Sequence, residues 1–338
     1  MSRPTINQIA QRSGVSKSAV SYALSGKAGV SAATRARILA VADQMNWRPS
    51  TTARALAGRR AGAIGLVLAR PARLLGLEPF YMEFISGVQE VLVAKDISLV
   101  FKVASGPVEE VATLRQWALS RIVDGVILTD LSTDDKRPVI VRQLGLPAVV
   151  VGPQPDAESV ALWTPDADAM RAVVRYLAGL GHRRIARVGG IPAFLHTQLR
   201  TGAMESEMAA LGLASPVIVH TDYSEEQGAR ATRRLLGAAE RPSAIVYDND
   251  VMAAVGLSVA AELGFDVPDD VSVVAWDDSV LARVTRPPLT ATSVDVRAYS
   301  MAVAEALLEM VGGGRPESGV SGGVGLSVRG STAPPRER

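Results

Sequence analysis

The sequence contains no cysteine, and this absence removes several kinds of chemistry. Without thiols the chain can form no disulfide, no thiolate metal site and no covalent intermediate on a cysteine nucleophile. Its three histidines, His182, His196 and His220, are far apart and show no HxxxH spacing, which argues against a histidine-based metal site. We therefore expect neither a metal nor another cofactor.

Long apolar segments are also missing. No uninterrupted apolar run reaches the ~18 residues of a membrane span. The N-terminus has no apolar secretory segment either, because a helix-forming stretch begins almost at once, so we expect a cytoplasmic protein. With 338 residues and 48% hydrophobic content, the chain has room for a small head and two further domains with real cores.

Acidic side chains are nearly absent from the first 60 residues. This stretch holds ten Lys and Arg but a single acid, Asp43. The rest of the chain holds 26 Lys and Arg against 33 Asp and Glu, so the net charge of +2 combines a head of +9 with a body of −7. Such asymmetry indicates a nucleic-acid-binding arm, whose affinity should fall steeply with salt as phosphates are neutralised.

The stretch Thr5–Leu24 has the pattern of two short helices joined by a tight turn. Apolar residues recur at helical spacing before Ser13-Gly14, and Gly can take the positive φ that a sharp turn needs. Ser16 then stands where the N-cap of the next helix belongs. On that helix Val20 and Ala23-Leu24 form an inward face and leave a polar outer one. This is the pattern of a helix-turn-helix, whose second helix enters the DNA major groove.

A third helix is predicted from Ser31, its N-cap, to about Asn46, with Trp47 closing the three-helix core. Pro49 stops it, and a further segment, Ser50–Ala57, can form a helix only when something supports it, because about eight residues are too few to be helical alone. The segment could be a plain linker. Alternatively it is a hinge helix in the minor groove, with Leu56 as an apolar wedge that partly unstacks a base step.

Beyond Gly62, short apolar runs alternate with amphipathic helical segments. Eight runs are predicted to be buried strands, and their alternation with crossover helices indicates parallel α/β sheets. Eight units are too many for one small sheet, so we expect two lobes of similar plan, which face each other across the carboxyl ends of their strands and form a cleft. The predicted strands are Ile64–Ala69, Ile97–Val103, Val123–Leu128, Ala148–Val151, Ile185–Val188, Val217–His220, Ala244–Tyr247 and Val271–Trp276, with a last one at Leu326–Arg329.

Several long stretches resemble the LacI/GalR family of bacterial transcription regulators. In the head they are TINQIAQRSGVSKSAVSYALSG, VSAATRARIL and NWRPSTTARALAG; in the body they include EPFYMEFISGVQEV, LAGLGHRRIA, YDNDVMAAVGL and VPDDVSVVAWDDSVLARVTRPPLT. The resemblance implies an all-α head and a two-lobed core of the periplasmic-binding-protein type with parallel sheets. It implies repression of a palindromic operator by a dimer, gated by a small effector of the class of sugars and related metabolites.

The expected domains follow from this plan. They are a helix-turn-helix domain at 1–49, a hinge at 50–61, a first lobe at 62–162 with 292–317, and a second lobe at 163–291 with 318–338. A regulator of this kind would act in the cytoplasm on the nucleoid.

The resemblance also assigns residues to the DNA-binding surface. Lys17, Ser18 and Tyr22 stand where base-reading side chains stand, Ser16 and Ser21 where phosphates are contacted, and Leu56 at the wedge. Thr5, Ser31, Thr34 and Ala53 complete the expected surface. Tyr22 replaces the Arg that the family usually has, which removes a bidentate guanine contact worth about 1–3 kcal/mol of discrimination, so a different operator base should be read.

For the effector, the resemblance points to Phe80, Arg200, Tyr223, Asn249 and Asp277. Asp and Asn can bind vicinal hydroxyls, Arg donates a planar fork, and Tyr223 matches an aromatic that stacks on a sugar face. Each also has a structural interpretation: Asp277 could cap a loop, Arg200 could form a surface ion pair, and Phe80 could be core. Asn249-Asp250 could cap the next helix, a role we expect mainly of Asp250. Gly152 replaces an Asp of many members, which removes one hydroxyl contact.

Two other classes of function fit less well. A transported-solute-binding protein would have a signal peptide and no basic head. A sugar hydrolase would need two carboxylates flanking the scissile bond, and Asp277 and Asp278 are adjacent in sequence. A dehydrogenase would need GxGxxG between its first strand and helix, whereas the glycines near 323 lie in a tail. We therefore expect no enzyme.

Overall fold

The computed structural model describes residues 4–25, 27–45, 47, 60–70 and 78–336. The chain divides into two compact units, Met1–Ala61 and Gly62–Arg338. The predicted hinge segment 50–57, with Ala53 and Leu56, lies outside the described residues, and so does the loop 71–77. No helix in the described ranges is long and apolar enough to cross a bilayer.

The first unit contains three short helices with well-defined caps. They are α1 (Ile6–Ser13), α2 (Lys17–Ser25) and α3 (Ala32–Gln44). Thr5 caps α1 in a capping box with Gln8, and Gly14 ends that helix in the left-handed region at φ 65°. Ser16 accepts the backbone N–H of Ala19 at 3.2 Å. The expected turn and N-cap are thus both confirmed.

The core of the first unit is small and apolar. Ile9, Val20 and Ile38 are completely buried, one from each helix, and Ala10, Ala23 and Ala42 fill the space between them. Trp47 packs against this cluster, as predicted. Ser31 caps α3 by accepting the N–H of Thr34 at 3.2 Å. Helices α1 and α3 therefore pack against α2 and hold it in place.

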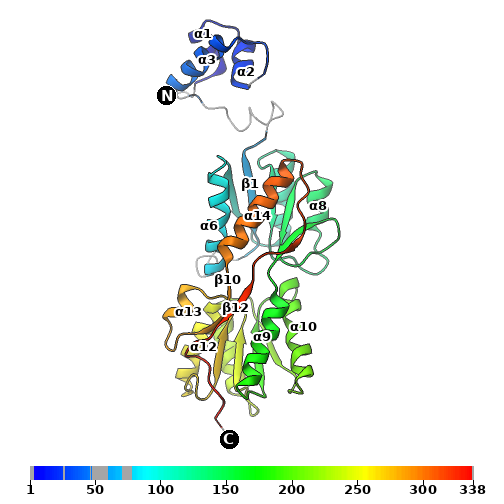
Figure 1. Ribbon diagram of the computed structural model, residues 1–338, viewed down its shortest axis with the longest axis vertical. Coiled ribbons are helices and arrows are strands. Elements are labelled where there is room, and N and C mark those ends of the chain that lie inside the picture. The colour runs from blue at the N-terminus through cyan, green and yellow to red at the C-terminus, as the bar shows by residue number, and fades with distance from the viewer. Residues whose placement is uncertain (1–3, 26, 46, 48–59, 71–77, 337–338) are drawn as a thin grey trace. The chain divides into compact units, whose positions relative to one another are not determined.

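The second unit consists of two α/β lobes (Figure 1). The first lobe has a six-stranded parallel sheet in the order β11-β5-β4-β3-β1-β2. Helices α6 and α14 cover one face, and α7 and α8 cover the other. The strands are β1 (Ala63–Leu68), β2 (Ser98–Val103), β3 (Gly125–Leu128), β4 (Ala148–Val151), β5 (Val160–Trp163) and β11 (Gly319–Val320). The helices are α6 (Pro79–Val93), α7 (Pro107–Leu119), α8 (Arg137–Gln143) and α14 (Val296–Val311).

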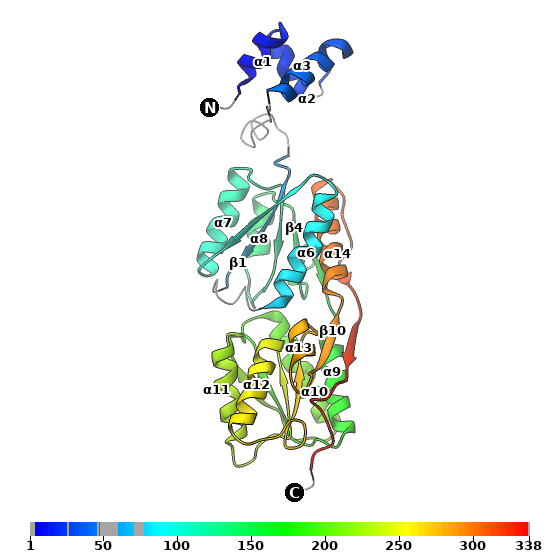
Figure 2. The ribbon, with the colours of Figure 1, turned by 90° about the vertical axis from the view of Figure 1, so that its left-hand side faces the viewer.

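The second lobe repeats this plan with the order β12-β10-β9-β8-β6-β7, in which only β12 is antiparallel (Figure 2). Helices α9 and α10 pack on one face, and α11 and α12 pack on the other. The strands are β6 (Ile185–Gly189), β7 (Val217–His220), β8 (Ala244–Tyr247), β9 (Ser272–Ala275), β10 (Thr290–Val294) and β12 (Val324–Ser327). The helices are α9 (Asp166–Gly179), α10 (Leu195–Ala210), α11 (Glu225–Leu236), α12 (Asp250–Glu262) and α13 (Val280–Val284).

The chain passes between the lobes three times, after β5, after β10 and after β11. Two of these crossings differ from the expected boundaries. All of β10 pairs in the second sheet up to Val294, whereas 292–317 was assigned to the first lobe. Strand β11 pairs with β5 in the first sheet, whereas 318–338 was assigned to the second. Strand β11 lies at the edge of its sheet, and β10 lies next to the edge strand of the other. The sheet that such a strand joins depends on its hydrogen-bonded neighbour and cannot be inferred from its composition.

Candidate functional site

The head presents one polar helix face. Lys17, Ser18, Ser21 and Tyr22 are all exposed on α2, while Val20 and Ala23 of the same helix are buried. Tyr22 keeps 44% of its surface exposed. The structure therefore brings the predicted base-reading residues together on the helix that a major groove would receive.

The remaining predicted DNA contacts have local roles as well. Thr5 and Ser31 are exposed N-caps, and the Ser31 hydroxyl also donates to Thr34 at 2.9 Å. The first N–H groups of α1 and α3 thereby form two polar helix starts at the surface, which favour anions such as phosphates. Ser16 Oγ lies 2.9 Å from Ser18 Oγ, so these two hydroxyls are held together at the start of α2.

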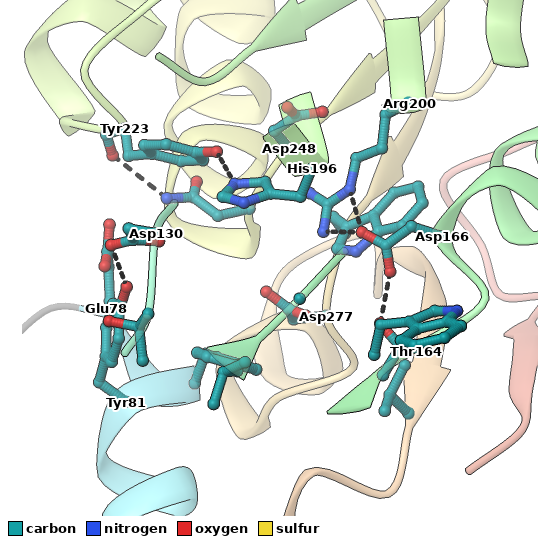
Figure 3. A pocket seen from close by; sticks show the side chains of 18 of the residues that line it. Glu78, Tyr81, Asp130, Thr164, Asp166, His196, Arg200, Tyr223, Asp248 and Asp277 are labelled. Atoms are coloured by element: carbon teal, nitrogen blue, oxygen red, sulfur yellow. Dashed lines mark hydrogen bonds and ion pairs between the residues drawn. The ribbon is translucent and has the colours of Figure 1, made fainter. Parts of the chain in front are cut away.

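A pocket lies between the lobes, at the carboxyl ends of strands from both sheets (Figure 3). Asp130 follows β3, Trp163 ends β5, and Asp277 follows β9 by two residues. Ligands of doubly wound sheets bind at this edge, because the loops that follow the strands converge there. All five predicted effector residues line it: Phe80, Arg200, Tyr223, Asn249 and Asp277.

Asp277 presents its carboxyl group to the pocket. Its backbone lies in the left-handed region at φ 74°, a conformation that non-glycine residues rarely adopt. The carboxyl group has no hydrogen-bond partner within the described part of the chain, and its backbone N–H reaches Thr292 Oγ1 at 3.4 Å. Burial raises the pKa of Asp277 to about 8, with Asp250 adding to the shift and Arg200 opposing it. The loop-capping interpretation of this side chain therefore finds no support.

Arg200 is held rigidly beside Asp277. Its Nη2 lies 2.6 Å and its Nε 2.7 Å from Asp166 Oδ2, and its guanidinium lies 4.0 Å from the ring centre of Trp276. Thr164 donates to the other oxygen of Asp166. Arg200 is therefore a buried, preorganised donor rather than a surface ion-pair partner.

Tyr223 lines the pocket in a different way from that expected. Its backbone is also left-handed, at φ 70°, and its hydroxyl lies 2.8 Å from His196 Nε2. The ring is buried, and the Arg70 guanidinium lies 4.5 Å from its centre. In this conformation a cation occupies the face that was expected to stack on a sugar. Phe80 and Trp163 are the half-buried aromatic rings of the lining.

Asn249 and Asp250 exchange the roles expected of them. Asn249 is the N-cap of α12: its Oδ1 accepts the Met252 N–H at 2.8 Å, and its amide nitrogen donates to the Tyr223 carbonyl at 3.2 Å. Asp250 is the first helical residue, and its carboxylate accepts a hydrogen bond from the Ser279 hydroxyl. Asn249 therefore fixes the loop that carries Tyr223, while both side chains border the pocket.

A buried charged cluster that sequence reasoning missed forms the wall nearest α6. Arg70 contacts Asp130 at 2.8 Å and Glu78 at 3.2 Å, and the Tyr81 hydroxyl donates to Asp130. Burial raises the pKa of Glu78 to about 7, while Arg70 lowers that of Asp130 to about 2 although burial opposes this. The sequence does contain a sign that these residues line a site: Arg70, Asp130 and Asp277 each follow a predicted strand within two residues.

The lining of the pocket can bind a polar small molecule. It offers carboxyl, amide and guanidinium groups together with aromatic surface, which suits a polyhydroxylated small molecule. Within the described ranges no group of three or more His, Cys, Asp or Glu is arranged to hold a metal ion. A helical head with an exposed polar helix face, joined in one chain to a two-lobed core with a pocket between its lobes, is the architecture of a DNA-binding transcriptional regulator.

Comparisons with known proteins agree with this class. Residues 5–50 match the family described as bacterial regulatory proteins, lacI family, and residues 174–332 match the periplasmic binding protein-like domain. The HTH-type transcriptional regulator MalR of Streptomyces coelicolor is 32% identical, over 96% of this chain and 95% of that protein. The chain belongs to the LacI family and is a transcriptional regulator, not an enzyme.

Solved structures show the same architecture. The complex of the transcriptional regulator CelR with cellobiose has a TM-score of 0.75 and 27% identity, covering 97% of this chain and all of that one. The lac repressor dimer bound to operator and the anti-inducer ONPF has a TM-score of 0.83, covering 98% of this chain and all of that one. At 24% identity the second likeness establishes the fold alone. The predicted fold class is confirmed.

Proposed function

We propose that this regulator is a repressor that binds a palindromic operator as a dimer and responds to a small polyhydroxylated effector, a sugar or related metabolite. The observation that carries the proposal is the pocket, whose walls come from both lobes of a chain that also bears a DNA-reading head. A ligand that contacts both walls stabilises one arrangement of the lobes over others, and this preference can be passed to the head.

The DNA-binding surface is proposed to consist of Thr5, Ser16, Lys17, Ser18, Ser21, Tyr22, Ser31, Thr34, Ala53 and Leu56. The exposure of α2 and the polar helix starts at Thr5 and Ser31 support the assignment for the described members. Since the target is DNA, we place the protein at the nucleoid in the cytoplasm. For the effector we assign direct contacts to Phe80, Arg200 and Asp277, and a positioning role to Asn249 and Tyr223.

A dimer follows from how a helix-turn-helix reads DNA. One recognition helix contacts only a few base pairs, whereas two related by a twofold axis match a palindrome. The body offers apolar surface for such a contact: Met82 on α6 and Val280 and Val284 on α13 are 59%, 65% and 60% exposed. Both helices lie on the same side of the two lobes (Figures 1 and 2).

The oligomeric state can be tested by light scattering of the purified full-length chain. We expect a dimer, and we expect Met82→Arg and Val284→Arg to shift it toward the monomer. Leu119→Arg is the matched control, because this residue is 77% exposed on α7. A monomeric wild-type protein at micromolar concentration would refute the dimer.

The regulatory function is tested by two measurements on the full-length protein. A thermal-shift screen against sugars and polyols should find compounds that raise the melting temperature, because ligands of the folded state stabilise it. Selection from random DNA should enrich a palindrome, and the stabilising compounds should change the affinity for it. A protein that prefers no palindrome over scrambled DNA, with or without these compounds, would refute the proposal.

A further inference from the structure

Among the described residues, the lining of the pocket holds more carboxyl groups than cations to pair with them. Six acidic side chains line it: Glu78, Asp130, Asp166, Asp248, Asp250 and Asp277. Three arginines contact them, since Arg70 pairs with Asp130 and Glu78, Arg200 pairs with Asp166, and Arg187 behind the wall pairs with Asp248. When Arg187 is counted with the described lining, a formal excess of three negative charges remains.

The excess is concentrated on three side chains. Asp277 has no ion-pair partner among the described residues. Asp250 has only the Ser279 hydroxyl and the start of α12 to stabilise its charge. Glu78 shares Arg70 with Asp130, which has the shorter contact. One of the three comes from the first lobe and two come from the second, so they face a ligand from both walls.

A buried carboxylate without a counter-charge is costly, and two events remove the cost. Either the group keeps its proton, or a cation enters and pairs with it. Without a bound cation the first event is favoured, because burial and mutual repulsion raise the pKa of Glu78 to about 7 and that of Asp277 to about 8. His196, which also lines the pocket, adds no positive charge, because burial lowers its pKa to about 4.

We propose that the effector is a polyhydroxylated amine, such as an amino sugar, whose ammonium group lies among Glu78, Asp250 and Asp277. The inference rests on the proposed function of the pocket and specifies its ligand. Arg200, which already pairs with Asp166, donates hydrogen bonds to ligand oxygens, and Phe80 and Trp163 contact the ligand's C–H surface. A phosphorylated or carboxylated sugar would meet like charge and is excluded.

The test compares matched pairs by calorimetry with the full-length protein at pH 7. The pairs are glucosamine with glucose, galactosamine with galactose, and mannosamine with mannose; glucuronate and glucose 6-phosphate are the anionic arms. We expect at least one amine to bind about tenfold tighter than its hydroxyl partner, as a charge-assisted hydrogen bond allows. Its binding should release protons, seen as a heat that changes with the ionisation enthalpy of the buffer.

Two variants locate the amine. Asp277→Asn and Glu78→Gln should each remove most of the preference for the amine over its partner and reduce the proton release. Glu226→Gln is the matched control, because this carboxylate is exposed on α11 and pairs with Arg230. Melting curves confirm that each variant is folded, and either variant alone is sufficient for the test.

Three results would overturn the inference, and they differ in what they say of the pocket. If a neutral sugar binds as tightly as its amine in every pair and releases the protein from DNA, the amine class is wrong but the proposed function stands. If an anionic arm binds best, the charge argument itself fails. If no arm binds and Asp277→Asn leaves regulation by growth medium unchanged in a reporter strain, the effector pocket and this inference fail together.

Discussion

The guanidinium of Arg70 lies 4.5 Å from the ring centre of Tyr223, and this contact joins the first lobe to the second. The ring of Phe194, also from the second lobe, lies 5.4 Å from the same group. Nearby, the backbone of Leu195 donates to Leu131 and that of Thr133 donates to Ala193, at 2.9 and 3.0 Å. One edge of the pocket is therefore closed by direct contacts between the lobes.

Replacing Arg70 should destabilise the core strongly. Arg70→Met leaves the buried carboxyls of Asp130 and Glu78 without their cation, and breaking a buried ion pair on one side costs about 3–5 kcal/mol. Urea unfolding monitored by circular dichroism measures the loss. Arg142→Met, which breaks a half-exposed pair with Asp156, is the control and should cost less than about 1 kcal/mol. Equal losses would contradict the role of Arg70.

Asp277→Asn should abolish the response to effector while DNA binding is retained. The side chain has no other described partner, so its removal affects ligand contact more than folding. Fluorescence anisotropy of a labelled operator, titrated with effector, measures both properties. The adjacent Asp278→Asn is a useful contrast, since Asp278 pairs with Arg329 at 2.6 Å and should affect stability but not response. A normal response in Asp277→Asn would rule out the assigned contact.

Lys17→Ala and Ser18→Ala should weaken binding to the operator more than binding to random DNA. Loss of a base contact costs about 1–3 kcal/mol on the specific site only. Arg37→Ala removes an exposed charge from α3 and serves as the control, with a similar small effect on both DNAs. Competition binding at fixed salt distinguishes the two patterns. Equal loss on operator and random DNA would show that α2 contacts only phosphates.

Leu56→Ala should reduce operator affinity and operator bending without changing effector affinity. A smaller side chain cannot unstack a base step, whereas it leaves the pocket untouched. Circular-permutation gel shifts report the bend, and calorimetry reports effector affinity. If operator binding and bending are unchanged, the minor-groove wedge is wrong and the segment 50–57 acts as a linker.

The stability of the unliganded protein should fall as pH rises from about 4.5 to about 8. The pKa of Glu78 is raised from 4.5 to about 7 and that of Asp277 from 3.8 to about 8, so the folded state binds more protons than the unfolded one in this window. Two groups act in the opposite sense: Asp130 below this window, since its pKa is lowered to about 2, and His196 in the lower part of the window, since its pKa is lowered from 6.5 to about 4. The two raised carboxyl groups together outweigh His196. Melting temperatures across this range should decline less steeply in Asp277→Asn. An identical slope in both proteins would contradict a protonated Asp277.

The sequence alone predicts those strands and helices whose pattern of apolar residues matches their burial in the structure. The β1 and β8 strands are continuous apolar runs buried on both faces, and α2 carries its polar and apolar residues on opposite sides. The sequence patterns do not predict strand β5 or helix α14. β5 is short and only partly buried, and α14 follows a crossing between lobes, where chain order no longer indicates which sheet is adjacent.

The site was predictable in position but not in its charge pattern. The motifs place Asp277 just after β9 and Arg200 in the second turn of α10, and the topology then brings them to one edge. It does not show that Asp166 holds Arg200, because Asp166 is 34 residues away in another helix. Nor does it show that Arg70 covers Tyr223, since this contact requires both lobes to be folded and adjacent.

The three crossings between the lobes restrict how this regulator can be recombined. Each lobe is assembled from separate stretches of chain, so a fragment ending at Trp163 would lack α14 and leave one sheet face covered by α6 alone. A chimera that exchanges one lobe with a homologue must be spliced at three places, after β5, β10 and β11. Exchange of the helix-turn-helix, by contrast, needs a single junction, so new operator preferences can be grafted far more easily than new halves of the effector pocket.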